Sequence, residues 1–343
     1  MLLLLLFIRS PWGQGIIVDR LVSYISNKTN TTVAIDRLFI TFSGDISLEG
    51  LYMEDKEGDT LVYSRHLEAD IPLMPLIKGK GISIDNLDWS GVRANIKRQD
   101  TIEGYNYQFL MDAFISPDTS STAADTTSGG MSIKLGDLEL NDFKINFNDR
   151  VAGIESNFML GKLDVQMQQF ALDKMTFDMG DAVLENTRFS YSQTKPFPEN
   201  KDQESSPMPS FSVKNLKISN VYGDYQSIPD GLLADIGIDD LILELPEANL
   251  KENKIIIERF RLKDSNILIQ TAATSARDIV PSETQQEKQA FEWPDWNILA
   301  EEITLVDNHL QFLTEGETPQ KGVFNPKAIE LASFALQANH LAY

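Results

Sequence analysis

The sequence predicts a mainly β protein, in which an N-terminal membrane-anchor helix and a short amphipathic helix precede an extended, curled antiparallel β-sheet of repeated hairpins. From Val33 onward, stretches with an apolar residue at every second position alternate with polar turns of Asn, Asp, Ser and Gly, which is typical of half-buried strands and hairpins. Before Val33, one segment has apolar residues at helical spacing. We therefore expect an anchor over 1–12, an amphipathic helix over 13–30 and a hairpin array over 31–343.

The chain begins with an uninterrupted apolar run, Met1 to Ile8. Because crossing a bilayer takes about 20 apolar residues, we interpret this run as the end of a transmembrane helix, and both ends of the chain as the edges of a fragment. The alternative interpretation is a short buried segment. Trp12 lies where an aromatic residue of the membrane interface is expected. The anchor prediction uses Leu2, Leu3, Leu4, Leu5, Leu6, Phe7, Ile8 and Trp12.

The amphipathic helix is expected from about Gln14 to Asn27. Its apolar residues recur three and four positions apart, as they do on one face of a helix. The polar run from Asn27 to Thr32 ends the pattern. The residues expected on the apolar face are Ile17, Val18, Leu21, Val22 and Ile25.

The expected hairpin consists of alternating apolar residues, a polar turn of two residues, and further alternating apolar residues. The clearest copy runs from Leu138 to Phe147, with Asn141-Asp142 as its turn. Hairpins recur roughly every 40 residues, and pairs of them form a possible larger repeat of about 80 residues. Because side chains alternate across a strand, each hairpin places its apolar residues on one face. The other two-residue turns are expected at Glu49-Gly50, Ser90-Gly91, Asp173-Lys174 and Ser219-Asn220.

Three polar stretches interrupt the array, near 116–130, 195–209 and 275–289. They are rich in Ser, Thr, Asp, Glu, Gln and Pro, which is typical of loops. Since the hairpin pattern continues unchanged after each of them, we interpret all three as loop insertions in one array.

Composition and motifs argue against several classes of function. The net charge of −21 disfavours binding to nucleic acid. The chain has no cysteine, and His66, His309 and His340 stand apart without the neighbours of a metal or catalytic motif. We therefore expect no catalytic residues, no metal and no cofactor, and we expect that the protein is not an enzyme.

The candidate functional site is the apolar face itself. It is either the core of a closed sandwich of two sheets or a groove for lipid chains, and alternation alone does not separate these interpretations. Transfer of an acyl chain into water costs about 0.8 kcal/mol per methylene, so a lipid carrier needs an unbroken apolar path. The residues expected to line it are Leu138, Leu140, Phe143, Ile145, Phe147, Val213, Leu216, Ile218, Ile267, Ile269, Leu310 and Phe312.

The N-terminal third has a recognisable order of features. The apolar run and Arg9-Ser10-Pro11-Trp12 lead into the helix, alternation follows from Val33 to Leu51, and Gly58-Asp59-Thr60-Leu61 comes next. This order resembles the start of the TamB and AsmA-like proteins, in the form found in Bacteroidota. The resemblance covers the whole chain loosely and residues 1–110 more specifically. It rests on pattern and includes no signature residue.

The resemblance implies a protein anchored in the inner membrane by a single helix, with most of the chain in the periplasm. It implies a curled β-groove that guides phospholipid between the inner and outer membranes. A barrel partner resembling TamA or BamA would bind a C-terminal domain that this chain lacks. Two alternatives remain. The array could be a scaffold for outer-membrane protein assembly or secretion without lipid carriage, or a secreted or surface β-rich adhesin.

Overall fold

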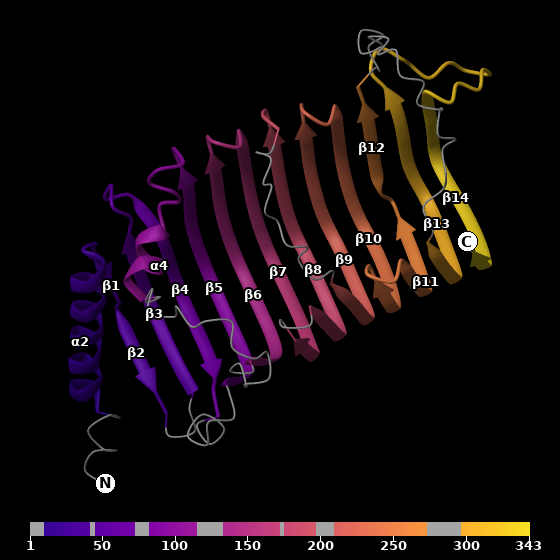
Figure 1. Cartoon of the computed structure of the whole chain (residues 1–343). Coiled ribbons are helices and arrows are strands. Elements are labelled where there is room, and N and C mark those ends of the chain that lie inside the picture. The colour runs from indigo at the N-terminus through magenta and orange to yellow at the C-terminus, as the bar shows by residue number, and fades with distance from the viewer. Residues whose placement is uncertain are drawn as a thin grey trace.

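In the computed structural model, the chain is mainly β, with two short helices and one large sheet (Figure 1). The structure describes residues 10–41, 45–72, 82–114, 133–171, 175–196, 209–272 and 296–343. The helices are α2 (Pro11–Thr29) and α4 (Gln108–Phe114). The strands are β1 (Val33–Ala34), β2 (Arg37–Ile40), β3 (Asp45–Glu54), β4 (Thr60–Asp70), β5 (Ile82–Arg98), β6 (Ile133–Asp149), β7 (Ile154–Ala171), β8 (Thr176–Gln193), β9 (Ser210–Ser227), β10 (Leu232–Asn249), β11 (Lys254–Lys263), β12 (Asn266–Thr271), β13 (Asn297–Thr314) and β14 (Ala328–Ala342).

The strands form a single 14-stranded sheet, which runs from β1 and β2 at one edge to β14 at the other. Figure 1 shows that the sheet is curved along its strands. Within the described part of the chain, no strand contacts a strand other than its neighbours in this sheet. The described strands therefore form one layer, whereas a sandwich needs two sheets packed face to face.

The pairing is largely, but not wholly, antiparallel. β5 pairs with β6, β8 with β9, and both β11 and β12 with β13 in parallel. The expectation of a purely antiparallel array is therefore wrong at these places. A parallel pair requires the chain to return to the edge of the sheet where the previous strand began, and the sequence between the paired strands covers the predicted loop insertions. These insertions lie outside the described residues, except at 195, 196 and 209.

The expected turn at Asn141-Asp142 is wrong. Both residues lie in the middle of β6, and the register with β7 passes from Asn141–Lys162 directly to Phe143–Leu160. Asp142 has a φ of 57°, so the alternation of β6 shifts by one residue there, while the register is unchanged because Gly161 on β7 is skipped as well. Such an irregularity and a two-residue turn both favour residue types that tolerate positive φ, which is why the pattern was ambiguous. Glu49-Gly50, Ser90-Gly91 and Ser219-Asn220 likewise lie inside strands, while Asp173-Lys174 lies outside the described residues.

These positive-φ residues align across the sheet, and we call their row the positive-φ line. For example, the β8–β9 register skips Asn186 and Asn220, which face each other and have φ angles of 52° and 53°. Because the alternation shifts by one position in both paired strands, apolar residues before and after the line stay on the same face. Residues with positive φ along the line are Gly50, Gly91, Asp142, Asn186, Asn220, Asp264, Asp307 and Ser333.

The predicted amphipathic helix is confirmed and is slightly longer than expected. Ser10 caps α2 by accepting a hydrogen bond from the Gly13 amide at 2.9 Å, and Asn30 ends it in the left-handed conformation. The helix packs against β1 and β2 at the first edge of the sheet. The short helix α4 was not predicted. It contacts α2 through Phe114, whose ring lies 4.6 Å from the Lys28 ammonium.

The predicted membrane anchor has no support in the structure. Met1 to Ile8 lies outside the described residues. Within the ranges that are described, no helix is long and apolar enough to cross a membrane. Trp12 lies in the first turn of α2 with 71% of its surface exposed. The anchor therefore stays a prediction.

Candidate functional site

One face of the sheet carries rows of apolar side chains that run across the strands. Residues directly opposite each other on paired strands project from the same face, so the register defines each row. One row crosses ten strands without a polar side chain. Its members, from β4 onward, are Leu67, Trp89, Leu140, Leu163, Leu184, Ile218, Leu241, Leu262, Leu305 and Leu336. We call this surface the apolar face.

The predicted residues of β6 and β9 lie on the apolar face in two packed clusters. In the first, Phe143 is buried with Val92 and Leu160, and Leu140 and Ile145 pack against them. In the second, Val213 is buried with Val165 and Ala182, and Leu138 and Leu216 pack against them. Leu163 contacts both clusters, so they are continuous. Phe147 lies beside Tyr105, with 6.0 Å between the ring centroids, and Ile218 belongs to the row above.

The remaining predicted residues extend this surface toward the other edge. Ile267 pairs with Ile236 on one side and with Leu310 on the other, and Ile269 pairs with Phe312. The structure thus places all twelve predicted lining residues on one face, although those of β6 and β13 are far apart along the sheet. Phe312 is 43% exposed. Lys144, Asn146, Lys214 and Lys217, which were expected on the opposite face, are exposed.

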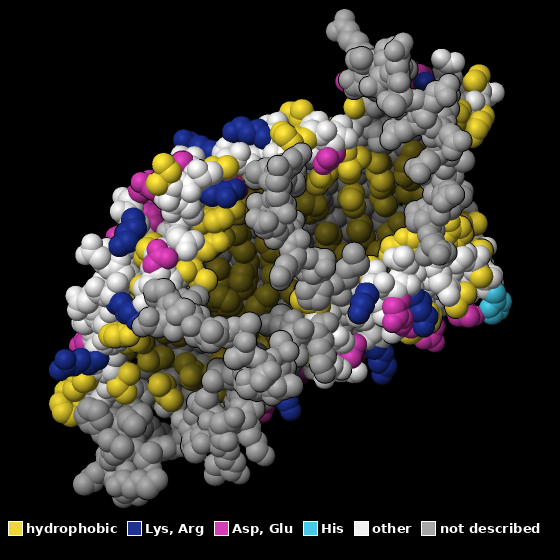
Figure 2. Space-filling view, in the orientation of Figure 1, with side chains coloured by type: hydrophobic (Ala, Val, Ile, Leu, Met, Phe, Trp, Pro, Cys, Tyr) yellow, Lys and Arg dark blue, Asp and Glu magenta, His cyan; other side chains and the backbone are white. Residues whose placement is uncertain are grey.

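Burial shows that the described strands leave this face only partly covered. Most row residues, including Leu140, Ile145 and Ile218, are half-buried. The largest fully buried side chains are all polar: Gln193, Asn308, Thr29, Asp149, Ser64 and Ser227. A second sheet packed on this face would bury the large Leu and Phe side chains completely. Figure 2 shows hydrophobic side chains gathered in the hollow of the curved sheet, with charged side chains around its rim.

Trp89 shows how a polar atom is accommodated on the apolar face. Its indole Nε1 donates a hydrogen bond to the hydroxyl of Ser64 at 2.8 Å, and Ser64 is only 1% exposed. Its ring packs edge-on against Phe143, with 5.4 Å between centroids. Because the indole N–H is satisfied within the protein, Trp89 presents only hydrocarbon to the hollow.

The opposite face carries ion pairs around the positive-φ line. The carboxylate of Asp142 accepts from Arg65 at 2.7 Å and from Arg93 at 2.8 Å. The hydrogen bond from Arg93, reinforced by both positive charges, outweighs the effect of burial and keeps the pKa of Asp142 below its usual value. This network ties β4 and β5 to β6, across a parallel pair.

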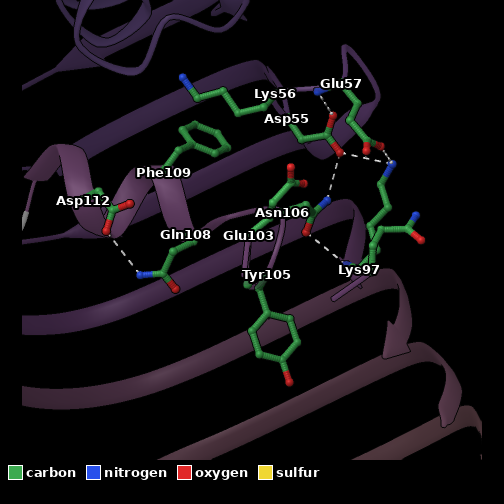
Figure 3. Close-up of a pocket in the computed structure, with 12 residues that line it drawn as sticks. Asp55, Lys56, Glu57, Lys97, Glu103, Tyr105, Asn106, Gln108, Phe109 and Asp112 are labelled. Atoms are coloured by element: carbon green, nitrogen blue, oxygen red, sulfur yellow. Dashed lines mark hydrogen bonds and ion pairs between the residues drawn. The ribbon is translucent and has the colours of Figure 1, made fainter. Parts of the chain in front are cut away.

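A separate cavity of about 350 Å³ lies at one end of β5, beside α4 (Figure 3). Asp55, Glu57 and Asp59 bring three carboxylates together there, which is a possible cation-binding arrangement. However, the Lys97 ammonium lies 3.4, 2.8 and 2.5 Å from them. Burial raises the pKa of Asp55. Hydrogen bonds from Asn106 and two backbone amides, with the charge of Lys97, together lower it by more, so the pKa lies below its usual value. The ammonium of Lys97 therefore already pairs with all three carboxylates and offsets part of their charge.

A set of buried polar side chains beside the apolar face was not predicted from the sequence. Asp149 ends β6 with its carboxylate paired to the guanidinium of Arg98 and hydrogen-bonded to the Tyr105 hydroxyl at 3.1 Å. Burial raises the pKa of Asp149, but these partners and the Ala152 amide hold it below its usual value. Gln193 and Ser227 occupy equivalent positions on β8 and β9. Each residue is polar and comes just before a turn, so nothing in the sequence marked it as buried.

Comparison with known proteins gives no relative from which a role could be inferred. No protein-family model matches the chain, and no curated protein matches it. The resemblance to the TamB and AsmA-like proteins therefore stays a prediction from the pattern of residues.

Proposed function

We propose that this protein holds phospholipid acyl chains on its apolar face and guides them between the inner and outer membranes of a cell envelope. In this proposal the chain is the membrane-proximal part of a protein anchored in the inner membrane, with the sheet in the periplasm. The protein acts without catalysis, metal or cofactor. A TamA- or BamA-like barrel is the proposed partner of a domain beyond this chain.

The observation that supports the proposal is the continuity of the apolar rows. A 16-carbon chain in water costs roughly 13 kcal/mol relative to an apolar surface, so any polar interruption of the path would be a barrier to movement. The row through Leu140 and Leu163 crosses ten strands without interruption. Most of its side chains are half-buried, which leaves them able to contact a bound chain.

The test compares two neighbouring residues on opposite faces of β6. Ile145→Asp places a carboxylate on the apolar face, and Asn146→Asp makes a similar-sized charged change on the exposed face. In Ile145→Asp, we expect a loss of several-fold in co-purified phospholipid, measured by mass spectrometry, and a loss of about 1–3 kcal/mol in unfolding free energy. In Asn146→Asp, we expect lipid content to match the wild type.

Ile218→Asp on β9 repeats the test at an independent position, should Ile145→Asp fail to fold. Wild-type protein without lipid after gentle extraction would contradict the proposal and favour a scaffold for outer-membrane protein assembly or an adhesin. Equal lipid loss in Ile145→Asp and Asn146→Asp would also contradict it, because the effect would then be independent of the face.

A further inference from the structure

The two long borders of the apolar face differ in chemistry. One border lies at the turns that follow β6 and β9, and its outermost row contains Asp149, Gln193 and Ser227. We call it the polar rim. The opposite border ends in a ladder of Phe170, Phe177 and Phe211, whose ring centroids are 5.6 and 5.5 Å apart. We call it the phenylalanine rim.

The polar rim combines aromatic rings with hydroxyl groups. Tyr191 and Tyr225 stack with 5.0 Å between centroids and an interplanar angle of 4°. The Tyr191 hydroxyl donates to Gln193 Oε1 at 3.0 Å. Tyrosines of this kind suit a boundary between hydrocarbon and water, because the ring is apolar and the hydroxyl is polar.

Two cations stand just outside the polar rim. Arg150 lies in the turn after β6, and the Lys195 ammonium donates to the Arg150 carbonyl at 2.6 Å. Both side chains are exposed, and neither forms an ion pair with any carboxylate in the described ranges. By contrast, Lys254 near the phenylalanine rim is paired with Glu247 at 2.6 Å.

The phenylalanine rim continues as hydrocarbon toward β13. Phe211 pairs with Ala248, Ala248 with Ile255, and Ile255 with Ile298. A molecule lying on the apolar face therefore meets hydroxyls, the two cations and the carboxylate of Asp230 at one border, and a row of hydrocarbon side chains at the other. This asymmetry is complementary to a phospholipid, which has a phosphate at one end and acyl chains at the other.

We infer that phospholipid lies on the apolar face with its phosphate headgroup at the polar rim and its acyl chains directed toward the phenylalanine rim. This inference rests on the proposed function and adds an orientation to it. Arg150 and Lys195 attract the phosphate, the tyrosine pair packs at the junction of headgroup and chains, and the phenylalanine ladder contacts the chain ends.

Photo-crosslinking tests the orientation on the whole chain. Two phospholipids are used, one with a diazirine on the headgroup and one with a diazirine at the end of an acyl chain, and mass spectrometry identifies the labelled peptides. We expect the headgroup probe to label peptides with Arg150, Tyr191 or Tyr225, and the chain-end probe to label those with Phe177 or Phe211. The reverse distribution, or the same distribution for both probes, would overturn the orientation. Absence of labelling by either probe would instead contradict the proposed function.

Two double variants of equal charge sharpen the test. Arg150→Glu/Lys195→Glu removes the cations of the polar rim, while Lys214→Glu/Lys217→Glu makes the same change on the exposed face of β9. We expect labelling of polar-rim peptides by the headgroup probe to fall several-fold in the first and to be unchanged in the second. The loss should be smaller in high salt, which screens exposed charges. Equal labelling in the two double variants would overturn the placement of the phosphate beside Arg150 and Lys195.

Discussion

The strands β4–β6 and the pair β9–β10 carry the same apolar rows but opposite arrangements of charge on the other face. In the first region, two arginines share the Asp142 carboxylate. In the second, Asp224 and Asp235 face each other directly on antiparallel strands. Directly opposed like charges are destabilising by up to about 1 kcal/mol. Since both regions belong to the same sheet, favourable charge pairing on this face is not required in every part of it.

The largest expected effect is in the first region, where Asp149→Ala should destabilise the protein by about 3 kcal/mol. The change leaves the Arg98 guanidinium unpaired in a partly buried place and removes the acceptor for the Val151 and Ala152 amides. Thermal or urea unfolding measures the loss. The matched change in an exposed pair, Asp164→Ala beside Lys162, should cost less than about 0.5 kcal/mol. Equal losses would mean that burial of the pair is unimportant.

A smaller effect is expected at the positive-φ line, to which each region contributes a residue. Gly91 has a φ of 69°, and a Cβ there would lie 2.6 Å from the Cβ of Arg65, so Gly91→Ala should cost about 2 kcal/mol. Asn220→Gly in the second region keeps the same backbone conformation and should change stability by less than about 0.5 kcal/mol. Chemical denaturation of both variants tests this. A neutral Gly91→Ala would show that the positive φ at this position is not required for stability.

The smallest effect should be a gain of about 0.5 kcal/mol in Asp235→Asn at neutral pH. Burial and the Asp224 carboxylate raise the pKa of Asp235 above its usual value. A carboxyl with a raised pKa contributes stability below its unfolded-state pKa of about 4, and loses it as the pH rises through the folded-state pKa. The gain in melting temperature should therefore be present at pH 7 and absent below about pH 4. A gain that persists in acid would point to a cause other than repulsion.

The sequence was sufficient to predict the apolar face because alternation is a local signal. Between Leu138 and Leu140 and the following Phe143 and Ile145, the alternation shifts by one residue at Asn141-Asp142. Both a turn and a positive-φ residue within one strand keep all four side chains on one face. What separates the two is strand length and pairing, which depend on residues far away in the chain. β6 is therefore one long strand paired with β5 and β7 and not a hairpin.

The polar rim could not have been predicted in the same way. Arg98 and Asp149 are distant in sequence and meet only because β5 and β6 are parallel and in register. A parallel pair leaves no short-range signal, since its strands are joined by a long connection. The amphipathic helix, by contrast, was predicted nearly in full, because its apolar spacing and the polar residues at its ends are all contained within α2.

The parallel pairs make the molecule modular. β6, β7 and β8 form an antiparallel meander, and β9, β10 and the collinear β11 and β12 form another. Since each meander has an odd number of strand positions, it begins at one border and ends at the other, and the next begins in the same orientation. Duplication or deletion of a whole meander would again place the last strand of one meander parallel to the first strand of the next, as β8 is already parallel to β9. The length of such a sheet can therefore change in evolution by copy number alone, with its two borders kept distinct.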